Sequence, residues 1–265
     1  MYPYILPNIF GYNLVTYDLL VIFGVFMMLL YVIRRFEQQD GFTKEQTNRI
    51  IILIVISLIL ALGISYLFDG IFHSIKEGEW SFGSINFLNG LIGGFVTFLI
   101  LMKYFYPYDN KDIKKITNTI ITGVVLAHAI GRIGCFFAGC CYGIPTESFL
   151  GVEFPYGHSH LHYPGEAVFP TQLFEAAFLL ILFFLMNKLH TFKNHEVKTY
   201  LIGYGIWRIL IEFIRGDDRG ILLPLFHTEY NTFPTPAQFM SLFMILFGLY
   251  LIYRDHQKTN QPMKE

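Results

Sequence analysis

The sequence predicts an all-α polytopic membrane protein with about seven transmembrane helices, an N-terminus outside and a cytoplasmic C-terminus. Composition is the first reason: 54% of the 265 residues are hydrophobic and only 15% are charged, whereas soluble domains carry about 25% charged residues. Apolar runs of about 20 residues, the length that crosses a bilayer as a helix, are the second reason. The distribution of Lys and Arg along the chain is the third.

The apolar runs define the predicted helices in order, within a single integral-membrane domain that covers residues 1–265. The first run is too long and too embedded to be a cleaved signal peptide. The third and fourth runs are weaker, because they are rich in glycine and interrupted by polar residues. The seven predicted spans cover residues 14–33, 50–68, 85–105, 116–135, 170–188, 199–215 and 235–253.

The basic residues predict the orientation, because cytoplasmic segments of membrane proteins are enriched in Lys and Arg. With the N-terminus outside, fourteen of the 19 Lys and Arg residues fall in the inner segments. Four arginines lie outside or near the outer ends of spans, so they need a reason beyond topology. These are Arg132, Arg208, Arg215 and Arg219.

Three segments between the predicted spans carry further expectations. Residues 69–84 are predicted to be an interfacial segment, with Trp80 and Phe82 at the level of the lipid headgroups. Residues 136–169 and 216–235 are predicted outer-face loops. Loops this long in a compact membrane protein are often functional.

Two arginines inside apolar runs are the most informative residues of the chain. Arg132 lies in VVLAHAIGRIGCFFAGCCYG, and Arg208 lies in LIGYGIWRILIEFIRG. A charge at membrane depth costs about 3 kcal/mol on insertion scales, so it usually faces a partner or a wet cavity. The two residues therefore predict a site for an anion within the bilayer, where a phospholipid phosphate is the most available anion.

Arg208 belongs to a stripe of polar residues on the sixth predicted span. Tyr204, Arg208, Glu212 and Arg215 recur at i, i+4, i+8 and i+11, so they share one face of a helix. Glu212 can pair with either arginine, one turn away on each side. The stripe is either a structural row of ion pairs, or a site in which Glu212 holds the guanidinium groups while Arg208 clamps an anion at two points.

The fourth predicted span ends in the glycine-rich stretch GRIGCFFAGCCYGIPT. A helix rarely continues through glycines at this density, so we expect it to break near the outer surface. Broken backbone at membrane depth is tolerated where it lines a cavity. The alternative is that the glycines only permit close packing between helices.

Three motifs together resemble the prolipoprotein diacylglyceryl transferase family. They are the stretch GRIGCFFAGCCYGIPT, the segment FPTQLFE and the segment YGIWRILIEFIR. The resemblance runs from about Tyr17 to the seventh span. It implies an enzyme of lipoprotein biosynthesis, a transferase that moves diacylglyceryl from phosphatidylglycerol to the lipobox cysteine thiol of a prolipoprotein.

The resemblance also implies partners and a location. The expected partners are phosphatidylglycerol, the signal-peptide and lipobox segment of a prolipoprotein, and membrane lipids, with no nucleic acid and no metal or soluble cofactor. The expected location is the bacterial plasma (inner) membrane, as a multi-pass protein with its active site towards the outer face.

Individual residues are assigned from the same motifs. Arg132 and Arg208 match the two arginines implicated in catalysis, and His128 is a third candidate catalytic residue because it lies one turn before Arg132. The expected substrate-binding residues are Tyr17, Asn89, Gly134, Gly143, Gln172, Tyr204, Glu212 and Arg215.

The chain departs from the family pattern at several positions. The signature asparagine is Cys135, and the acidic residue five positions later is Cys140. The two histidines of the pattern are replaced by Leu88 and Phe169. Proton removal from the acceptor thiol then relies on His128, on a carboxylate, or on the thiol's own ionisation in the positive field of the arginines. The other interpretation of His128 is a packed core histidine.

Two groups of metal-ligating residue types are expected to hold no metal. The three cysteines, Cys135, Cys140 and Cys141, are interpreted as small apolar residues in a tight turn. A thiol–disulfide centre or a disulfide is the alternative. The segment HSHLH at 158–162 would place three histidines on one face if it were extended, but a hydrated loop is the favoured interpretation.

Two other functions remain open at the level of sequence. One is a lipid transferase of the same fold with a different acceptor. The other is a non-catalytic membrane protein that binds anionic lipid through the same arginines, and the two replaced family histidines keep this alternative open.

Overall fold

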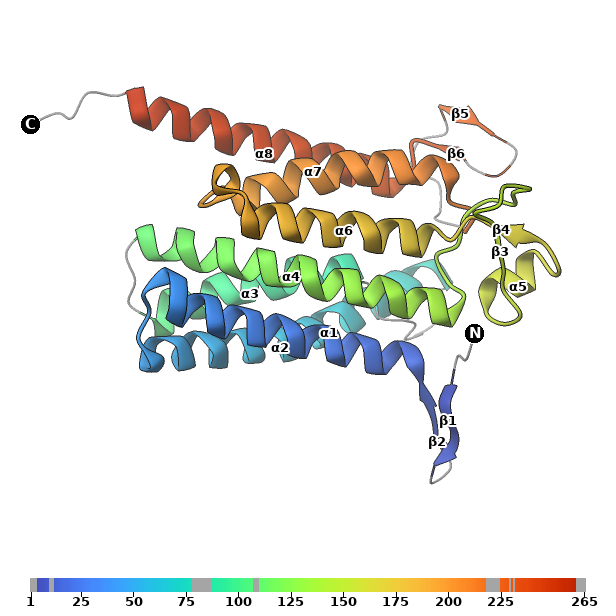
Figure 1. The fold of residues 1–265 in the computed structure, drawn as a ribbon, viewed down its shortest axis with the longest axis horizontal. Helices are drawn as coiled ribbons and strands as arrows, with labels where there is room; N and C mark the ends of the chain where they lie inside the picture. The colour runs from blue at the N-terminus through green and yellow to red at the C-terminus, as the bar shows by residue number, and fades with distance from the viewer. Residues whose placement is uncertain are drawn as a thin grey trace, which may run out of the picture. The chain divides into compact units, whose positions relative to one another are not determined.

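The structure is a computed structural model, and it describes residues 4–9, 12–77, 87–106, 110–217, 225–228, 230 and 232–260. This part of the chain is mainly helical (Figure 1). It groups into two compact units: unit 1 combines Met1–Tyr31 with Thr117–Glu265, and unit 2 is Val32–Ile116.

Each of the seven predicted spans corresponds to a helix in the described part of the chain. These helices are α1 (Thr16–Arg35), α2 (Lys44–Glu77), α3 (Phe87–Phe105), α4 (Asn110–Ala138), α6 (Thr171–Lys188), α7 (Glu196–Ile211) and α8 (Pro236–Asn260).

Short elements connect the long helices. Three antiparallel two-stranded sheets pair β1 (Tyr4–Ile9) with β2 (Tyr12–Val15), β3 (Val152–Glu153) with β4 (Ala167–Val168), and β5 (Phe226–His227) with β6 (Thr232–Phe233). The short helical elements are η1 (Phe36–Asp40), α5 (His158–His162), η2 (His190–Phe192) and η3 (Glu212–Ile214).

Five helices in the described residues are long and apolar enough to cross a membrane. Their spanning stretches are Thr16–Asp40, Lys44–Leu67, Asp112–Ala138, Thr171–Lys188 and Pro236–Gln257. The apolar part of α3 is the shorter stretch Gly93–Phe105, and α7 has 16 residues. The chain is therefore a polytopic, mainly α-helical membrane protein.

Unit 1 is built around a core shared by α4, α6 and α7. Figure 1 shows α6 beside α4 on one side and α7 on the other, with α8 beyond α7. The rings of Tyr200 and Tyr204 stack on each other at the α7 side of this core, with centroids 5.3 Å apart. The buried members of the core are Val125, Ala129, Leu179, Leu182, Phe183, Met186, Tyr200 and Tyr204.

The start of α8 is fixed by a capping box, in which the first turn and the residue before the helix satisfy each other's backbone N–H groups. Thr235 N donates to Gln238 Oε1 at 3.2 Å, and Gln238 N donates to Thr235 Oγ1 at 3.3 Å. Pro236 is the first helical residue, a position where its missing N–H costs nothing. The cap holds Thr235 at a defined place beside the end of α7.

Unit 2 depends on close packing between α2 and α3. A Cβ added at Gly93 would lie 2.6 Å from Ile64 Cγ2, and one added at Gly94 would lie 2.8 Å from Ala61 Cβ. Only glycine permits this approach, as in other helix pairs within membranes. The glycines of this span therefore serve helix packing.

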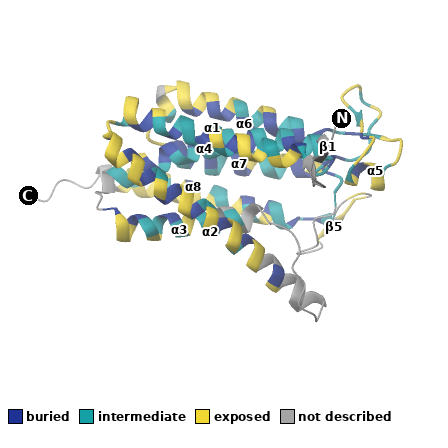
Figure 2. Cartoon of the chain, turned by 90° about the horizontal axis from the view of Figure 1, so that it is seen from below, coloured by how far each residue is buried: buried dark blue, intermediate teal, exposed yellow. Residues whose placement is uncertain are grey.

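Large apolar side chains are exposed along the membrane helices of both units. Figure 2 shows exposed residues alternating with buried ones along the helices. On α1 they include Ile22, Phe23 and Phe26, and on α8 they include Phe247 and Tyr250. Exposed apolar surface on this scale is characteristic of a lipid-facing surface rather than of a water-soluble protein.

The break expected near the end of the fourth span occurs later than the glycine pattern predicted. Helix α4 continues through Gly131 and Gly134 to Ala138 and ends at Gly139, whose φ is +65°. A Cβ at Gly139 would lie 2.5 Å from the carbonyl oxygen of Tyr156, so glycine is required there. The helix ends because position 139 adopts the left-handed conformation.

The three predicted connecting segments contain regular structure. Residues 69–77 of the expected interfacial segment continue α2, and residues 78–84 lie outside the described residues. Residues 136–138 still belong to α4, and the rest of 136–169 contains α5 and the β3–β4 pair. Within 216–235, the described residues contain the β5–β6 pair. The predicted loops are therefore partly ordered hairpins and helical turns.

Candidate active site

Arg132 on α4 and Arg208 on α7 converge on one carboxylate of α6. Glu175 Oε2 lies 3.1 Å from Arg132 Nε and 3.8 Å from Arg208 Nη1. The side chain of Glu175 is 2% exposed, and each arginine side chain is 13% exposed. Because charges in a low-dielectric interior must be paired, Glu175 is the shared counter-ion that stabilises both arginines at this depth.

Tyr204 and His128 complete the surroundings of Glu175. The Tyr204 hydroxyl donates to Glu175 Oε1 at 2.8 Å, and Arg132 Nε donates to His128 Nε2 at 3.3 Å. The His128 ring meets the Tyr204 ring edge-on, with centroids 5.3 Å apart. An arginine N–H can only donate, so His128 Nε2 is an acceptor and carries no proton in this arrangement.

Glu212 binds Arg208 on its other side. Glu212 Oε2 lies 3.3 Å from Arg208 Nη2, and its Oε1 accepts a hydrogen bond from Thr235 Oγ1 at 2.7 Å. The predicted i, i+4 pair is therefore confirmed. The capping residue of α8 fixes the carboxylate, so α8 contributes to the position of Arg208.

The predicted one-face stripe on the sixth span is wrong beyond Glu212. Helix α7 ends at Ile211, Glu212 begins the 3-10 helix η3, and Arg215 has extended backbone with φ −81° and ψ 145°. The Arg215 guanidinium binds Asp217 at two points, with Nη2–Oδ2 at 2.8 Å and Nε–Oδ1 at 3.0 Å. Because the helix narrows and then unwinds, Arg215 leaves the face that Tyr204 and Arg208 share.

Gly143 joins three segments of backbone. Its N–H donates to the Phe169 carbonyl at 2.8 Å, and the next residue, Ile144, donates to the Ile214 carbonyl at 2.9 Å. A Cβ at Gly143 would lie 2.6 Å from Phe169 Cβ, so no side chain fits. Gly143 therefore ties the chain that leaves α4 to the start of α6 and the end of α7.

The neighbouring Tyr142 is buried and links this junction to α5. Its hydroxyl contacts His162 Nδ1. Burial raises the pKa of the Tyr142 phenol to about 12, and the nearby Asp217 carboxylate adds to this effect. Residues 158–162 are helical rather than extended, so His160 points away from the side that His158 and His162 share. The three-histidine face considered from the sequence is not formed.

The other predicted site residues are Gly134, which contacts Tyr17, and also Gln172 and Asn89. Gly134 lets α1 approach α4, because a Cβ there would lie 3.2 Å from Tyr17 Cδ2. Gln172 is buried, and its Nε2 donates to the Cys140 carbonyl at 2.6 Å. Asn89 lies in α3 of unit 2, and its side chain is outside the described residues.

The arginine cluster retains capacity for an anion. Arg208 Nη1 is buried and makes no hydrogen bond to any residue that the structure describes. The two arginines are balanced by Glu175 and Glu212, so the four side chains have no net formal charge before a ligand binds. Because Arg208 Nη1 is not used in a hydrogen bond to a described residue, its N–H groups could donate to an added phosphate oxygen.

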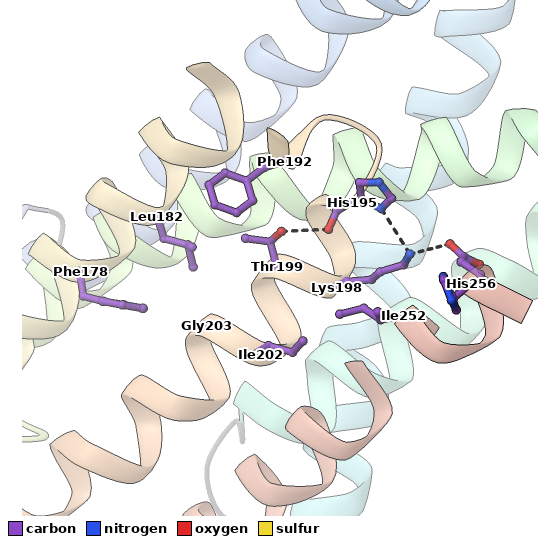
Figure 3. Close-up of a pocket in the computed structure, with 11 residues that line it drawn as sticks. Phe178, Leu182, Phe192, His195, Lys198, Thr199, Ile202, Gly203, Ile252 and His256 are labelled. Carbon is purple, nitrogen blue, oxygen red and sulfur yellow. Dashed lines mark hydrogen bonds and ion pairs between the residues drawn. The ribbon is translucent and has the colours of Figure 1, made fainter. Parts of the chain in front are cut away.

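A separate cavity lies at the other end of α7 (Figure 3). It has a volume of about 720 Å³ and is bordered by α6, α7 and α8. Lys198 lies at its polar end, 2.5 Å from Asp255 Oδ2 and 3.3 Å from His195 Nδ1. Lys198 precedes Arg208 by ten residues, about 15 Å of helix, so this cavity is distinct from the arginine cluster.

Comparison with known proteins identifies the family. A sequence model described as prolipoprotein diacylglyceryl transferase matches residues 4–254. The chain belongs to the prolipoprotein diacylglyceryl transferase family. It is 30% identical to the phosphatidylglycerol–prolipoprotein diacylglyceryl transferase of Clostridium tetani, over 95% of this chain and 97% of the relative. It is also 30% identical to the second such enzyme of Clostridium perfringens, over 93% of each chain.

In this member of the prolipoprotein diacylglyceryl transferase family, the sequence pointed to the central carboxylate without giving it a role. Glu175 matches the family pattern in the segment FPTQLFE, as Gln172 does, but it was not among the predicted catalytic and substrate-binding residues. The signal was present, because an acidic residue within a predicted span needs a cationic partner as much as an arginine does. Glu175 lies within 4 Å of His128, Arg132 and Arg208 alike.

Proposed function

We propose that the protein transfers the diacylglyceryl group of phosphatidylglycerol to the lipobox cysteine of a prolipoprotein. The observation that supports this most directly is the pair of buried arginines on one carboxylate, with Arg208 Nη1 making no hydrogen bond to any described residue. Family membership supports the same substrates, because both relatives named above carry phosphatidylglycerol and prolipoprotein in their names.

The reaction requires stabilisation of a growing negative charge. The acceptor sulfur forms a bond to the terminal glycerol carbon of the diacylglyceryl group, and the bond from that carbon to the phosphate-ester oxygen breaks. Glycerol phosphate leaves with the electron pair and gains one negative charge, and the thiol proton is released. Arg132 and Arg208 are already held in place by Glu175 and Glu212, so they stabilise this charge without rearrangement.

The remaining predicted site residues have supporting roles in this proposal. Tyr204 orients Glu175, and Gly143 and Gln172 hold the backbone that connects α4 to α6. Tyr17 borders the same end of α4 through Gly134. Arg215 is fixed by Asp217 at the edge of the junction, and in this proposal its charge assists an acceptor that enters from the outer face.

The decisive experiment measures thioether formation. The purified full chain would be incubated with phosphatidylglycerol labelled in its acyl chains and a peptide carrying a lipobox cysteine. We expect label on the wild-type peptide and none on a peptide with Ser in place of the cysteine. Labelled lipid binding without peptide labelling would contradict the transferase proposal. Label transfer to a different nucleophile would identify another acceptor.

His128 is expected to hold Arg132 rather than to accept the thiol proton. Its Nε2 lone pair is already directed at Arg132 Nε. His128→Gln retains a side-chain acceptor, so the transfer rate should fall less than about tenfold, whereas loss of a general base costs about 10²-fold or more. His128→Leu, which removes the acceptor, should be the more damaging of the two. A hundredfold loss in the glutamine variant, at normal membrane insertion, would instead identify His128 as the base.

Seven membrane crossings with an outer N-terminus and an inner C-terminus complete the proposal. The support is the correspondence of seven helices with seven predicted spans, and the basic residues that lie in the predicted inner segments. In cells, impermeant thiol reagents should label cysteines introduced at His160 and fail to label those at Lys114 and Lys193, in a background without the native cysteines. The reverse pattern would contradict the orientation.

A further inference from the structure

The three cysteines of the chain converge at the end of α4. Cys135 lies in the last turn of the helix, and Cys140 and Cys141 follow directly after it. All three are free thiols, and their Sγ atoms lie within 4.8 Å of one another. Among the residues that the structure describes, this is the only group of three or more His, Cys, Asp or Glu side chains close enough to hold a metal ion.

Hydrogen bonds to backbone carbonyl groups hold the chain around the thiols, and no disulfide is needed for this. Cys140 N donates to the Cys135 carbonyl at 3.2 Å, which closes the turn on itself. From α6, Gln172 Nε2 donates to the Cys140 carbonyl at 2.6 Å, and Thr171 Oγ1 donates to the Cys141 carbonyl at 2.7 Å. The positions of the three Cα atoms are therefore determined by the scaffold.

Cys141 has an unusual backbone conformation within this turn. Its φ is +59°, in the left-handed region that side chains other than glycine rarely adopt. Such a conformation costs on the order of 1 kcal/mol or more, and it persists where surrounding contacts impose it. Here it allows two consecutive cysteines to direct both sulfur atoms towards Cys135. Neighbouring residues of a regular helix would diverge by about 100°.

We propose that Cys135, Cys140 and Cys141 form a binding site for one soft, thiophilic metal ion, Zn²⁺ or Cu(I). Thiolate sulfur is the donor that selects these ions over Mg²⁺ or Ca²⁺. Sulfur atoms bonded to one ion at about 2.3 Å lie about 3.8–4.0 Å apart. Because the three Sγ atoms lie within 4.8 Å of one another, they would approach by at most about 1 Å to reach this geometry. Each thiol releases its proton to solvent as its bond to the metal forms, and no electron is transferred.

The two candidate ions differ in how the site would be completed. Zn²⁺ is usually four-coordinate, so three protein thiolates would leave one position for water or another ligand. Three thiolates would form a trigonal site for Cu(I). An odd number of thiols also argues against a purely disulfide role, because one bridge would leave the third cysteine unpaired.

The site lies next to the arginine cluster along two helices. Cys135 is one turn beyond Arg132 on α4, and Gln172, which binds the Cys140 carbonyl, is one turn before Glu175 on α6. A metal ion would therefore stiffen the junction between the helix ends that carry Arg132 and Glu175. The proposal stands on the thiol geometry and does not depend on the transferase function.

The test uses the full chain, purified in detergent under reducing, metal-free conditions. Separate samples would receive Zn²⁺ alone or Cu(I) alone, followed by removal of unbound metal and elemental analysis. We expect one equivalent to be retained, and competition between the two ions identifies the preferred one. Retained metal should also protect all three thiols from reaction with a thiol-reactive dye, when the folded protein is incubated with the dye in the absence of denaturant.

Variants separate the site from adventitious binding. Cys135→Ser, Cys140→Ser and Cys141→Ser should each weaken metal affinity by at least about 100-fold. The matched control is His160→Ala. Histidine is a residue type that can bind metal, but His160 is exposed and outside the cluster, so this substitution should leave the metal affinity unchanged. The proposal is overturned if the wild-type chain retains neither ion, if its thiols react equally with and without metal, or if the serine variants keep the metal. Because thiol protection is measured on the wild type, poor folding of a variant does not remove the test.

Discussion

Arg208→Ala should abolish diacylglyceryl transfer, and Arg208→Lys should lower its rate by about 10²-fold or more. Arg208 uses Nη2 to bind Glu212 at 3.3 Å and has a second nitrogen, Nη1, without a hydrogen bond among the described residues. A lysine has one nitrogen at the end of a flexible chain, so it cannot bind the carboxylate and present a fixed donor to a phosphate oxygen as a guanidinium does. Removal of one preorganised donor typically costs about 10²–10³-fold in turnover.

The chain offers a matched control for this prediction. Arg49 and Glu45 form the same i, i+4 pair at 2.7 Å, but their side chains are 58% and 76% exposed. Exposed pairs of this kind contribute little, so Arg49→Lys and Arg49→Ala should keep wild-type turnover and stability. Rates would be measured by the thioether assay at several phosphatidylglycerol concentrations. Activity of Arg208→Lys within threefold of wild type would contradict a two-point clamp.

The sequence was sufficient to predict the helices because most of them have a strong local signal. Apolar runs of about 20 residues predicted that these helices exist, since membrane insertion depends on hydropathy summed over a window. The predicted bounds agree closely with α1 and α6, whereas α2, α4 and α8 continue beyond the apolar run at one or both ends. The end of α7 differs in the other direction, because the helix stops before the predicted end. Where the helix stops, Glu212 accepts a hydrogen bond from Thr235, which is 23 residues away, and no local pattern reports that contact.

The site was predictable in its charges and not in its arrangement. Arg132 and Arg208 could be singled out because a buried cation is costly wherever it occurs. That they share Glu175 could not be predicted, because it depends on the tertiary packing that brings α6 between α4 and α7. The cysteine cluster was similarly hidden, because the left-handed conformation of Cys141 comes from hydrogen bonds to α6 and not from the cysteines themselves.

Glu175→Gln is the second variant with a large expected effect, and its kinetic signature is specific. Glutamine keeps the size of the side chain and an oxygen that can accept the Tyr204 hydroxyl, which lies 2.8 Å from Glu175 Oε1. It removes the charge that both arginines share and places an amide where Arg132 Nε now meets Oε2 at 3.1 Å. Breaking a buried pair in this way typically costs about 3–5 kcal/mol, so the thermal midpoint of unfolding should fall.

The two consequences of Glu175→Gln act in opposite directions on binding and on turnover. The four-residue cluster changes from no net formal charge to +1, so equilibrium binding of the phosphatidylglycerol headgroup should be unchanged or tighter. Turnover should still fall by about 10²-fold or more, because the arginines lose the group that orients them towards the leaving phosphate.

Glu196→Gln is the control, since Glu196 is a buried carboxylate at the start of α7, distant along the helix from Arg208. It should lower stability while keeping turnover. Parallel losses of turnover in both variants would show that Glu175 acts through folding alone, and weaker lipid binding in Glu175→Gln would contradict the charge argument.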